Sequence, residues 1–174
     1  MSLTSSEDQS SPDRIKESVS GYEGYAEVQN RNTSDTHLRK YFMQEFDEME
    51  KALAEYTSKV REQNDPKLYT PLEKLQKKFS TVGDSMRNPT YCDSTFFQKP
   101  DIDDDTLQQI YLYENLMFEE IENLISEISV LKNSVPEKEE LMDHVLRISD
   151  TLDALNQALF ERESLLAGDM EEFI

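Results

Sequence analysis

The 174-residue sequence is poor in residues that cross-link or interrupt a chain. It has no tryptophan, one cysteine (Cys92), four glycines and six prolines. A single cysteine excludes an internal disulfide and a cysteine-rich zinc site, and it is typical of a reducing compartment. Because glycine and proline mark turns, their scarcity favours long uninterrupted helices over a sheet with many connections.

Long hydrophobic runs and an excess of basic residues are also missing. No apolar run reaches the roughly 18 residues of a membrane-spanning helix. Residues 1–8 lack the basic and apolar regions of a signal peptide. We therefore expect no membrane insertion and a cytoplasmic or nuclear protein. The net charge of −19 also argues against direct nucleic-acid binding, because such a surface repels phosphates.

The acidic charge is concentrated in the second half of the chain. Residues 1–33 carry 6 acids and 3 bases, residues 34–100 carry 11 of each, and residues 101–174 carry 20 acids and 4 bases. The last segment is interpreted either as the solvated surface of long helices or as a surface for a basic partner.

The N-terminal residues show no helical or strand period. Residues 1–33 are rich in Ser, Asp, Glu, Gln and Asn, so we expect a disordered acidic, Ser-rich tail there. Within them, residues 21–28 (GYEGYAEV) form a short aromatic and apolar island. Such an island is either inert or a short docking motif that becomes ordered on a partner.

Apolar residues at steps of three and four predict a helical hairpin over residues 34–87. Its first helix begins near Ser34 or Asp35, either of which can cap it, and ends at Asp65-Pro66. A capping box at residues 70–73 (TPLE) starts the second helix. Residues 88–104 then lack a helical period but contain Tyr, Phe and Phe, so we expect an extended crossover that packs against the helices.

The strongest periodic signal lies in residues 105–174, which predict two acidic coiled-coil helices. The heptad positions of the third helix are apolar except for Glu114, and those of the fourth are apolar except for Arg162. A second capping box at residues 134–137 separates the two helices, as a hairpin or as a kink. The seam that we predict to bind a partner consists of Leu107, Ile110, Met117, Ile121, Leu124, Ile128, Leu131, Leu141, Val145, Ile148, Leu152, Leu155 and Leu159.

Together these patterns predict an all-α protein: an elongated helical bundle or coiled coil of about four helices with a disordered N-terminal tail. The helices are long, unequal and narrowly striped, and a narrow apolar stripe needs a facing surface. We therefore expect hetero-oligomeric packing against the helices of other proteins. A homo-oligomer and a self-sufficient monomeric bundle are the alternatives.

The sequence offers no candidate catalytic, cofactor-binding or metal site. His37 and His144 have no Cys, Asp or Glu at a recognised metal-ligand spacing, and no glycine-rich phosphate loop is present. Residues 101–105 match the start of a calcium loop, but Thr106 and Leu112 stand where Gly and Glu are required. We interpret these acids as favourable charge at a helix N-terminus and expect no enzymatic activity and no cofactor.

Short elements in residues 88–174 resemble the small helical shoulder subunit of dynactin. They are Asn88-Pro89-Thr90-Tyr91 before a long helix, and Val135-Pro136-Glu137 upstream of Ser164-Leu165-Leu166. Short subunits of kinetochore, vesicle-tethering and transcription-mediator assemblies look similar. The resemblance implies a non-enzymatic helical subunit or adaptor of a larger assembly, of the cytoskeletal, kinetochore or tethering type. The competing hypothesis is an acidic chaperone-like binder of basic proteins, which uses residues 101–174 as a polyanion.

Overall fold

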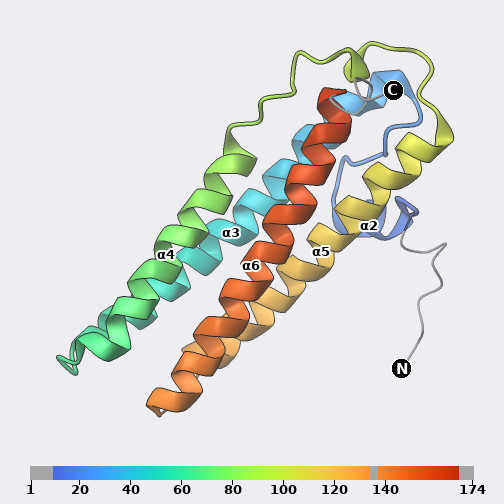
Figure 1. Ribbon diagram of the computed structural model, residues 1–174. Coiled ribbons are helices and arrows are strands. Elements are labelled where there is room, and N and C mark those ends of the chain that lie inside the picture. Colours follow the sequence, from blue (N-terminus) through green and yellow to red (C-terminus); the bar gives the residue numbers. More distant parts are fainter. Residues whose placement is uncertain (1–9, 134–136, 169–174) are drawn as a thin grey trace. The chain divides into compact units, whose positions relative to one another are not determined.

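The computed structural model describes residues 10–133 and 137–168, and over these residues the protein is all-α, with no strand. This confirms the predicted fold class. The long helices, labelled in Figure 1, are α3 (Arg31–Arg61), α4 (Pro66–Arg87), α5 (Asp104–Lys132) and α6 (Lys138–Ala167). The short ones are α2 (Asp13–Ser18) and the 3-10 helices η1 (Val28–Asn30) and η2 (Thr95–Phe97).

The chain forms two compact units, each built from segments that are far apart in the sequence. Unit 1 comprises Met1–Tyr41, Asn88–Glu119 and Gln157–Ile174, and unit 2 comprises Phe42–Arg87 and Glu120–Asn156. Helices α3, α5 and α6 each contribute residues to both units, whereas α4 belongs to unit 2 alone.

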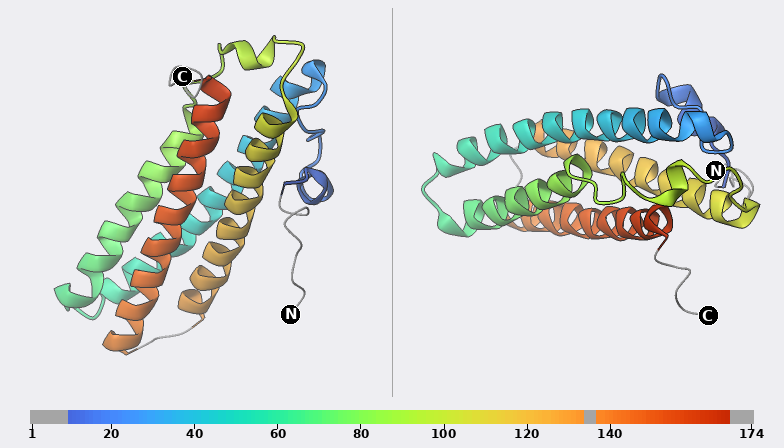
Figure 2. Two further views of the ribbon diagram at one scale, coloured as in Figure 1. Left: turned by 45° about the vertical axis from the view of Figure 1, so that its right-hand side comes forward. Right: turned by 90° about the horizontal axis from the view of Figure 1, so that it is seen from above.

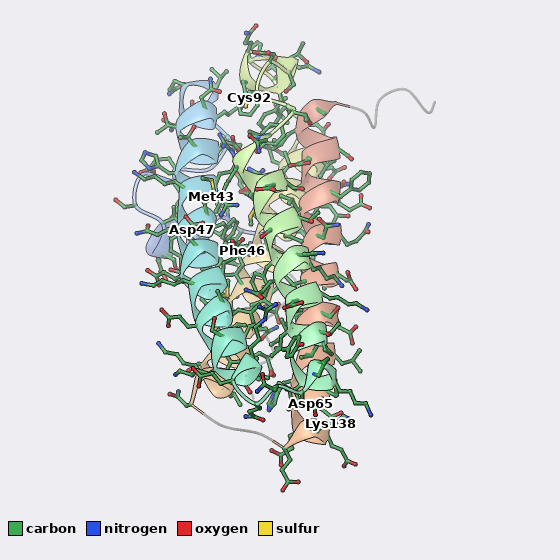
Figure 3. The ribbon with its side chains drawn as sticks, turned by 90° about the vertical axis from the view of Figure 1, so that its left-hand side faces the viewer. Met43, Phe46, Asp47, Asp65, Cys92 and Lys138 are labelled. Atoms are coloured by element: carbon green, nitrogen blue, oxygen red, sulfur yellow. The ribbon has the colours of Figure 1, made fainter. Side chains whose placement is uncertain are left out.

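Unit 2 is held together by the apolar stripes of four helices. In Figure 3, Phe46 on α3 lies between α3 and α4, where its ring centroid is 5.3 Å from that of Phe79. Leu124 of α5 and Leu152 of α6 are both fully buried. At the surface of the unit, Lys78 of α4 donates a hydrogen bond to Ser149 of α6. The stripes of α3 and α4 thus supply the facing surface that the stripes of α5 and α6 need.

Helix α4 begins five residues earlier than its sequence predicts. Asp65 caps it, because its Oδ1 accepts a hydrogen bond from the Lys67 N–H at 3.0 Å, and Pro66 occupies the first helical position. Pro71 therefore lies inside the helix rather than at its start. The helix is capped at Asp65 and not at Thr70, so the second helix has one further turn at its start.

The two predicted caps of the first long helix, Ser34 and Asp35, lie inside α3, which begins at Arg31 directly after η1. Both side chains are buried and are used for other contacts. The Ser34 hydroxyl accepts a hydrogen bond from the Glu23 N–H at 3.0 Å and donates one to the Gly24 carbonyl at 2.8 Å. Ser34 thus fixes the N-terminal segment to α3 instead of capping the helix.

The crossover contributes aromatic side chains to the core of unit 1. Tyr91, Phe96 and Phe97 are all buried, and the rings of Phe96 and Phe97 meet edge to face. The Ser94 hydroxyl donates a hydrogen bond to the Leu166 carbonyl at 2.6 Å, so the crossover passes the C-terminal end of α6 (Figure 2). That contact satisfies one of the carbonyls that a helix end leaves without a partner.

The N-terminal segment departs most from the sequence-based expectation. Residues 10–33 are not a disordered tail, because Ile15, Val19, Tyr22 and Tyr25 are at most 3% exposed and belong to the core of unit 1. Residues 1–9 of the predicted tail lie outside the described residues. The polar composition of the segment gives no sign of this docking, because Tyr22 and Tyr25 supply both the buried apolar area and the hydrogen-bonding hydroxyls. The aromatic island is therefore a docking motif, but the surface that it contacts is its own chain.

Two glycines allow the island to lie close to the helices. Gly21 and Gly24 have φ angles of +87° and +79°, which favour glycine. A Cβ on Gly21 would lie 2.7 Å from the His37 ring, and one on Gly24 would lie 2.9 Å from the Tyr111 hydroxyl. The island can therefore dock in this way only with glycine at both positions.

Gly24 and Gly168 form a matched pair for testing this docking. Gly168 also has a positive φ, +80°, but a Cβ there meets no described atom within 4 Å. We expect Gly168→Ala to lower the free energy of unfolding by about 1–2 kcal/mol, the strain of a left-handed residue. Gly24→Ala should lower it further, because the new methyl group also displaces Tyr111. Urea unfolding of the full chain measures both, and equal losses would contradict the docked geometry.

Candidate functional site

The two polar exceptions in the predicted seams are partners in the structure. Arg162 Nε of α6 donates a hydrogen bond to Glu114 Oε2 of α5 at 3.2 Å. Their side chains are 1% and 0% exposed, and both residues belong to unit 1. A buried charge without a partner is strongly unfavourable, so each residue accounts for the presence of the other.

Arg162 also contacts three further side chains with its terminal nitrogens. Nη2 lies 2.6 Å from Asp35 Oδ1 and 3.0 Å from the Tyr25 hydroxyl, and Nη1 lies 3.0 Å from the Tyr91 hydroxyl. The planar guanidinium suits this role, since it presents several donors in a fixed geometry. We call the set of residues around it the Arg162 cluster: Tyr22, Tyr25, Asp35, Tyr91, Glu114 and Arg162, each at most 2% exposed.

The tyrosines saturate the two carboxylates of the cluster. Tyr22 and Tyr25 donate their hydroxyl hydrogens to Oε1 and Oε2 of Glu114, at 2.7 and 2.9 Å. Tyr91 donates to Asp35 Oδ1 at 2.7 Å. The second oxygen of Asp35 accepts a hydrogen bond from Arg39 Nε at 3.0 Å.

The titration behaviour of the cluster follows from burial and charge. Burial, then the charge of Glu114, raises the pKa of Tyr22 and of Tyr25, so both phenols remain neutral donors. Burial also raises the pKa of Glu114, more than Arg162 lowers it. At Asp35, burial raises the pKa, but the charge and hydrogen bond of Arg162 outweigh it, and the pKa lies below its usual value.

Arg31, a second buried cation, binds backbone rather than carboxylates. Its Nε donates to the Tyr25 carbonyl and its Nη1 to the Phe96 carbonyl, each at 2.8 Å. Its guanidinium carbon also lies 5.2 Å from the centre of the Phe96 ring. Arg31 thus joins the start of α3 to the N-terminal segment and to the crossover.

The Arg162 cluster has the character of a structural network. Its carboxylate oxygens already accept hydrogen bonds from within unit 1, and its residues are buried. A network whose groups are satisfied in this way stiffens a fold and specifies one packing arrangement. It has no free acid or base turned toward solvent, so we place no reaction there.

No metal centre emerges from the described residues, since no group of three or more His, Cys, Asp or Glu is arranged to hold an ion. Asp103, in the acidic run before α5, instead caps the helix. Its Oδ1 accepts a hydrogen bond from the Thr106 N–H at 2.7 Å, and this bond lowers the pKa of Asp103. Asp104 and Asp105 lie in the first turn of α5, so three of these acids lie at the N-terminus of the helix, where negative charge is favourable.

The remaining candidate residues of the sequence have separate surroundings. His37 of unit 1 packs against Gly21, and His144 of unit 2 lies with its Nδ1 3.2 Å from Glu127 Oε2. Cys92 is exposed on the crossover (Figure 3).

Among the described helices, none combines the length and apolar character of a membrane span.

The predicted partner-binding seam is buried within the chain. All of its residues are buried except Leu107 and Val145, which are half-buried. Leu107, Ile110, Met117 and Leu159 belong to unit 1, and the others belong to unit 2. The seam is therefore not an open docking surface of the isolated chain, because stripes on the other helices of each unit cover it. Of the alternatives, this burial agrees with the self-sufficient bundle.

Unit 2 has a surface hollow of about 400 Å³ between α3 and α5, lined by both apolar and charged side chains. Ile125, which is 37% exposed, lies at this surface. We call it the α3–α5 groove; its lining residues are Glu45, Glu48, Met49, Lys51, Ala52, Glu55, Ile125, Ile128, Ser129 and Lys132. Its sequence signal is Ile125, an apolar residue that lies beside the heptad positions rather than on them.

The α3 wall of the groove carries acidic side chains without partners. Glu45, Glu48 and Glu55 form no ion pair or hydrogen bond with a described residue. Burial, followed by the negative charge of Glu48, raises the pKa of Glu45. The groove therefore combines a partly exposed apolar residue with three carboxylates and two lysines, Lys51 and Lys132.

Arg162→Met tests the buried network. The change leaves Glu114 and Asp35 inside unit 1 without their shared cation, so we expect a loss of about 3–5 kcal/mol in the free energy of unfolding. The control is Arg147→Met on the same helix, since Arg147 is 57% exposed and its contact with Glu127 is worth about 1 kcal/mol at most. Chemical denaturation measures both. Similar losses for the two variants would mean that the pairing of Arg162 contributes little.

The depressed pKa of Asp35 gives a pH dependence with a defined sign. Its ionised form stabilises the fold at neutral pH, and that stabilisation is lost as pH falls through its lowered folded-state pKa. The difference in unfolding free energy between the wild type and Asp35→Asn should therefore shrink between about pH 7 and pH 3. A difference that stays constant or grows on acidification would contradict the assignment.

The chain has no match among family models, curated proteins or solved structures. A function for it must therefore be based on its own geometry. Two features are available for that purpose: the Arg162 cluster in unit 1, which is saturated and buried, and the α3–α5 groove in unit 2, which is accessible and has unpaired charge.

Proposed function

We propose that the chain is a non-enzymatic helical adaptor or subunit of a larger protein assembly. The observation that carries the proposal is the α3–α5 groove, where Ile125 keeps 37% of its surface exposed beside buried Met49 and Ile128. Protein–protein contact sites combine an apolar centre with a polar rim. The cytoskeletal, kinetochore or tethering type of assembly stays part of the proposal.

The saturated Arg162 cluster supports a non-enzymatic role. Catalytic acids and bases need a path to their substrate and a free position for the transferred proton. The donors and acceptors of the cluster form hydrogen bonds that join five chain segments of unit 1. One of these segments is the island with Tyr22 and Tyr25. A stiff scaffold of this kind suits a protein that presents a surface.

The net charge favours the acidic chaperone-like binder as a second candidate. Residues 101–174 carry 20 acids and 4 bases, and with the seam turned inward many of these acids lie on the outer faces of α5 and α6, as exposed Glu139 and Glu140 do. Such a surface attracts basic proteins of many kinds. Its binding is weak in high salt, because exposed charges are screened.

Affinity purification of the tagged full chain at low and high salt separates these two functions. An adaptor should retain one or a few partners in fixed stoichiometry at both salt concentrations, because apolar burial carries the binding. A chaperone-like polyanion should instead capture a mixture of basic proteins that is lost at high salt. A chain that stays monomeric and retains no stoichiometric partner would contradict the adaptor proposal.

A further inference from the structure

We infer that the α3–α5 groove binds an amphipathic helix of a partner protein, whose apolar stripe is flanked by lysine or arginine. The inference rests on the proposed function and adds to it the chemistry of the partner. It also moves the binding site from the predicted seam, which is buried, to a surface that the chain leaves open.

The apolar part of the groove suits the stripe of a helix. Met49 and Ile128 are only 4% and 5% exposed, and Ile125 stands higher at the edge. Ala52 is small, so a larger side chain of a partner fits beside it. Recognition of a helix in a groove depends on a few apolar anchors on the helix that binds.

The charges in the groove determine which charge a partner needs. The α3 wall presents Glu45, Glu48 and Glu55 against one lysine, Lys51, and the α5 wall adds Lys132. The three carboxylates have no partner among the described residues. A partner with basic residues on the α3 side can pair with them, whereas an acidic helix, a nucleic acid or an anionic membrane is repelled.

A second hollow of unit 2, between α3 and α4, lacks this combination. Its charged residues Arg61 and Glu73 pair with each other across the hollow, and Thr57, Ser58, Ser80 and Thr81 make much of its lining polar. A partner there would have to break an existing ion pair, because the acidic side chain of its lining, Glu73, is already paired with Arg61. We therefore assign the helix to the α3–α5 groove.

A synthetic peptide provides a defined probe. It is a helix of about five turns with a leucine and alanine stripe flanked by lysines, and its control replaces every lysine with glutamate. We expect the lysine peptide to bind the full chain saturably at one to one, with the largest backbone amide shifts at Ala52, Ile125 and Ser129. The glutamate peptide should bind at least tenfold more weakly. Equal affinity of the two peptides, or no saturable binding, would overturn the inference.

Substitutions in and away from the groove identify the site. Ile125→Asp should weaken the lysine peptide at least tenfold, and Ser129→Arg, which places a long basic side chain over the groove, should do the same. Leu146→Asp is the matched control, because Leu146 is 61% exposed on α6 of the same unit but does not line the groove. All three positions are exposed, so the variants should fold, and thermal melts check this. Equal weakening by Leu146→Asp would show general adhesion and overturn the assignment.

Repeating the affinity purification with Ile125→Asp separates the two proposals. Loss of a stoichiometric partner that the wild type and Leu146→Asp both retain supports the groove. If Ile125→Asp still retains that partner, the groove is wrong although the adaptor function stands. If the wild type retains no partner, the adaptor function fails even where the peptide binds. Self-association of the chain that Ile125→Asp abolishes would make a second copy the occupant and would also overturn the inference.

Discussion

The pairing of Arg162 with Glu114 and Asp35 is the interaction on which the architecture of unit 1 depends. Each of these charges is unfavourable in a buried position on its own. Arg162 compensates both carboxylates, and the carboxylates compensate Arg162. Two of the three residues interrupt apolar seams, so a simple coiled-coil partner would leave them without compensation. Once the ions are paired, the remaining lone pairs of the carboxylates need donors, and tyrosine hydroxyls provide them.

That requirement explains why a polar N-terminal segment is ordered. Tyr22 and Tyr25 cover Glu114 with apolar rings and donate to both of its oxygens, while Arg31 and Ser34 bind the backbone of the same segment. Glycine at positions 21 and 24 lets the backbone come close enough. A segment with few apolar residues thus becomes part of the core, because it brings the donors that the buried charges lack.

The same logic separates the role of the core from the role of the surface. The apolar seams are covered by stripes within their own units, and the buried ions are saturated, so neither is available to a partner. On unit 2 the α3–α5 groove remains accessible, where Ile125 is partly exposed and three glutamates lie beside two lysines. A partner of such a protein binds to groups that stay exposed after folding. It does not bind to the apolar seams, although these show the most regular sequence pattern.

Local sequence determined the four long helices, because the 3.6-residue period, the capping residues and the prolines act within a few residues of one another. It also marked Glu114 and Arg162 as exceptions, although it could not pair them. Tertiary structure alone decided that the seams face inward, that Tyr22 and Tyr25 dock, and that Asp35 serves Arg162 rather than a helix end. Each of these outcomes depends on groups that are dozens of residues apart, and the free energy of burial and hydrogen bonding between such groups has no local signature in the sequence.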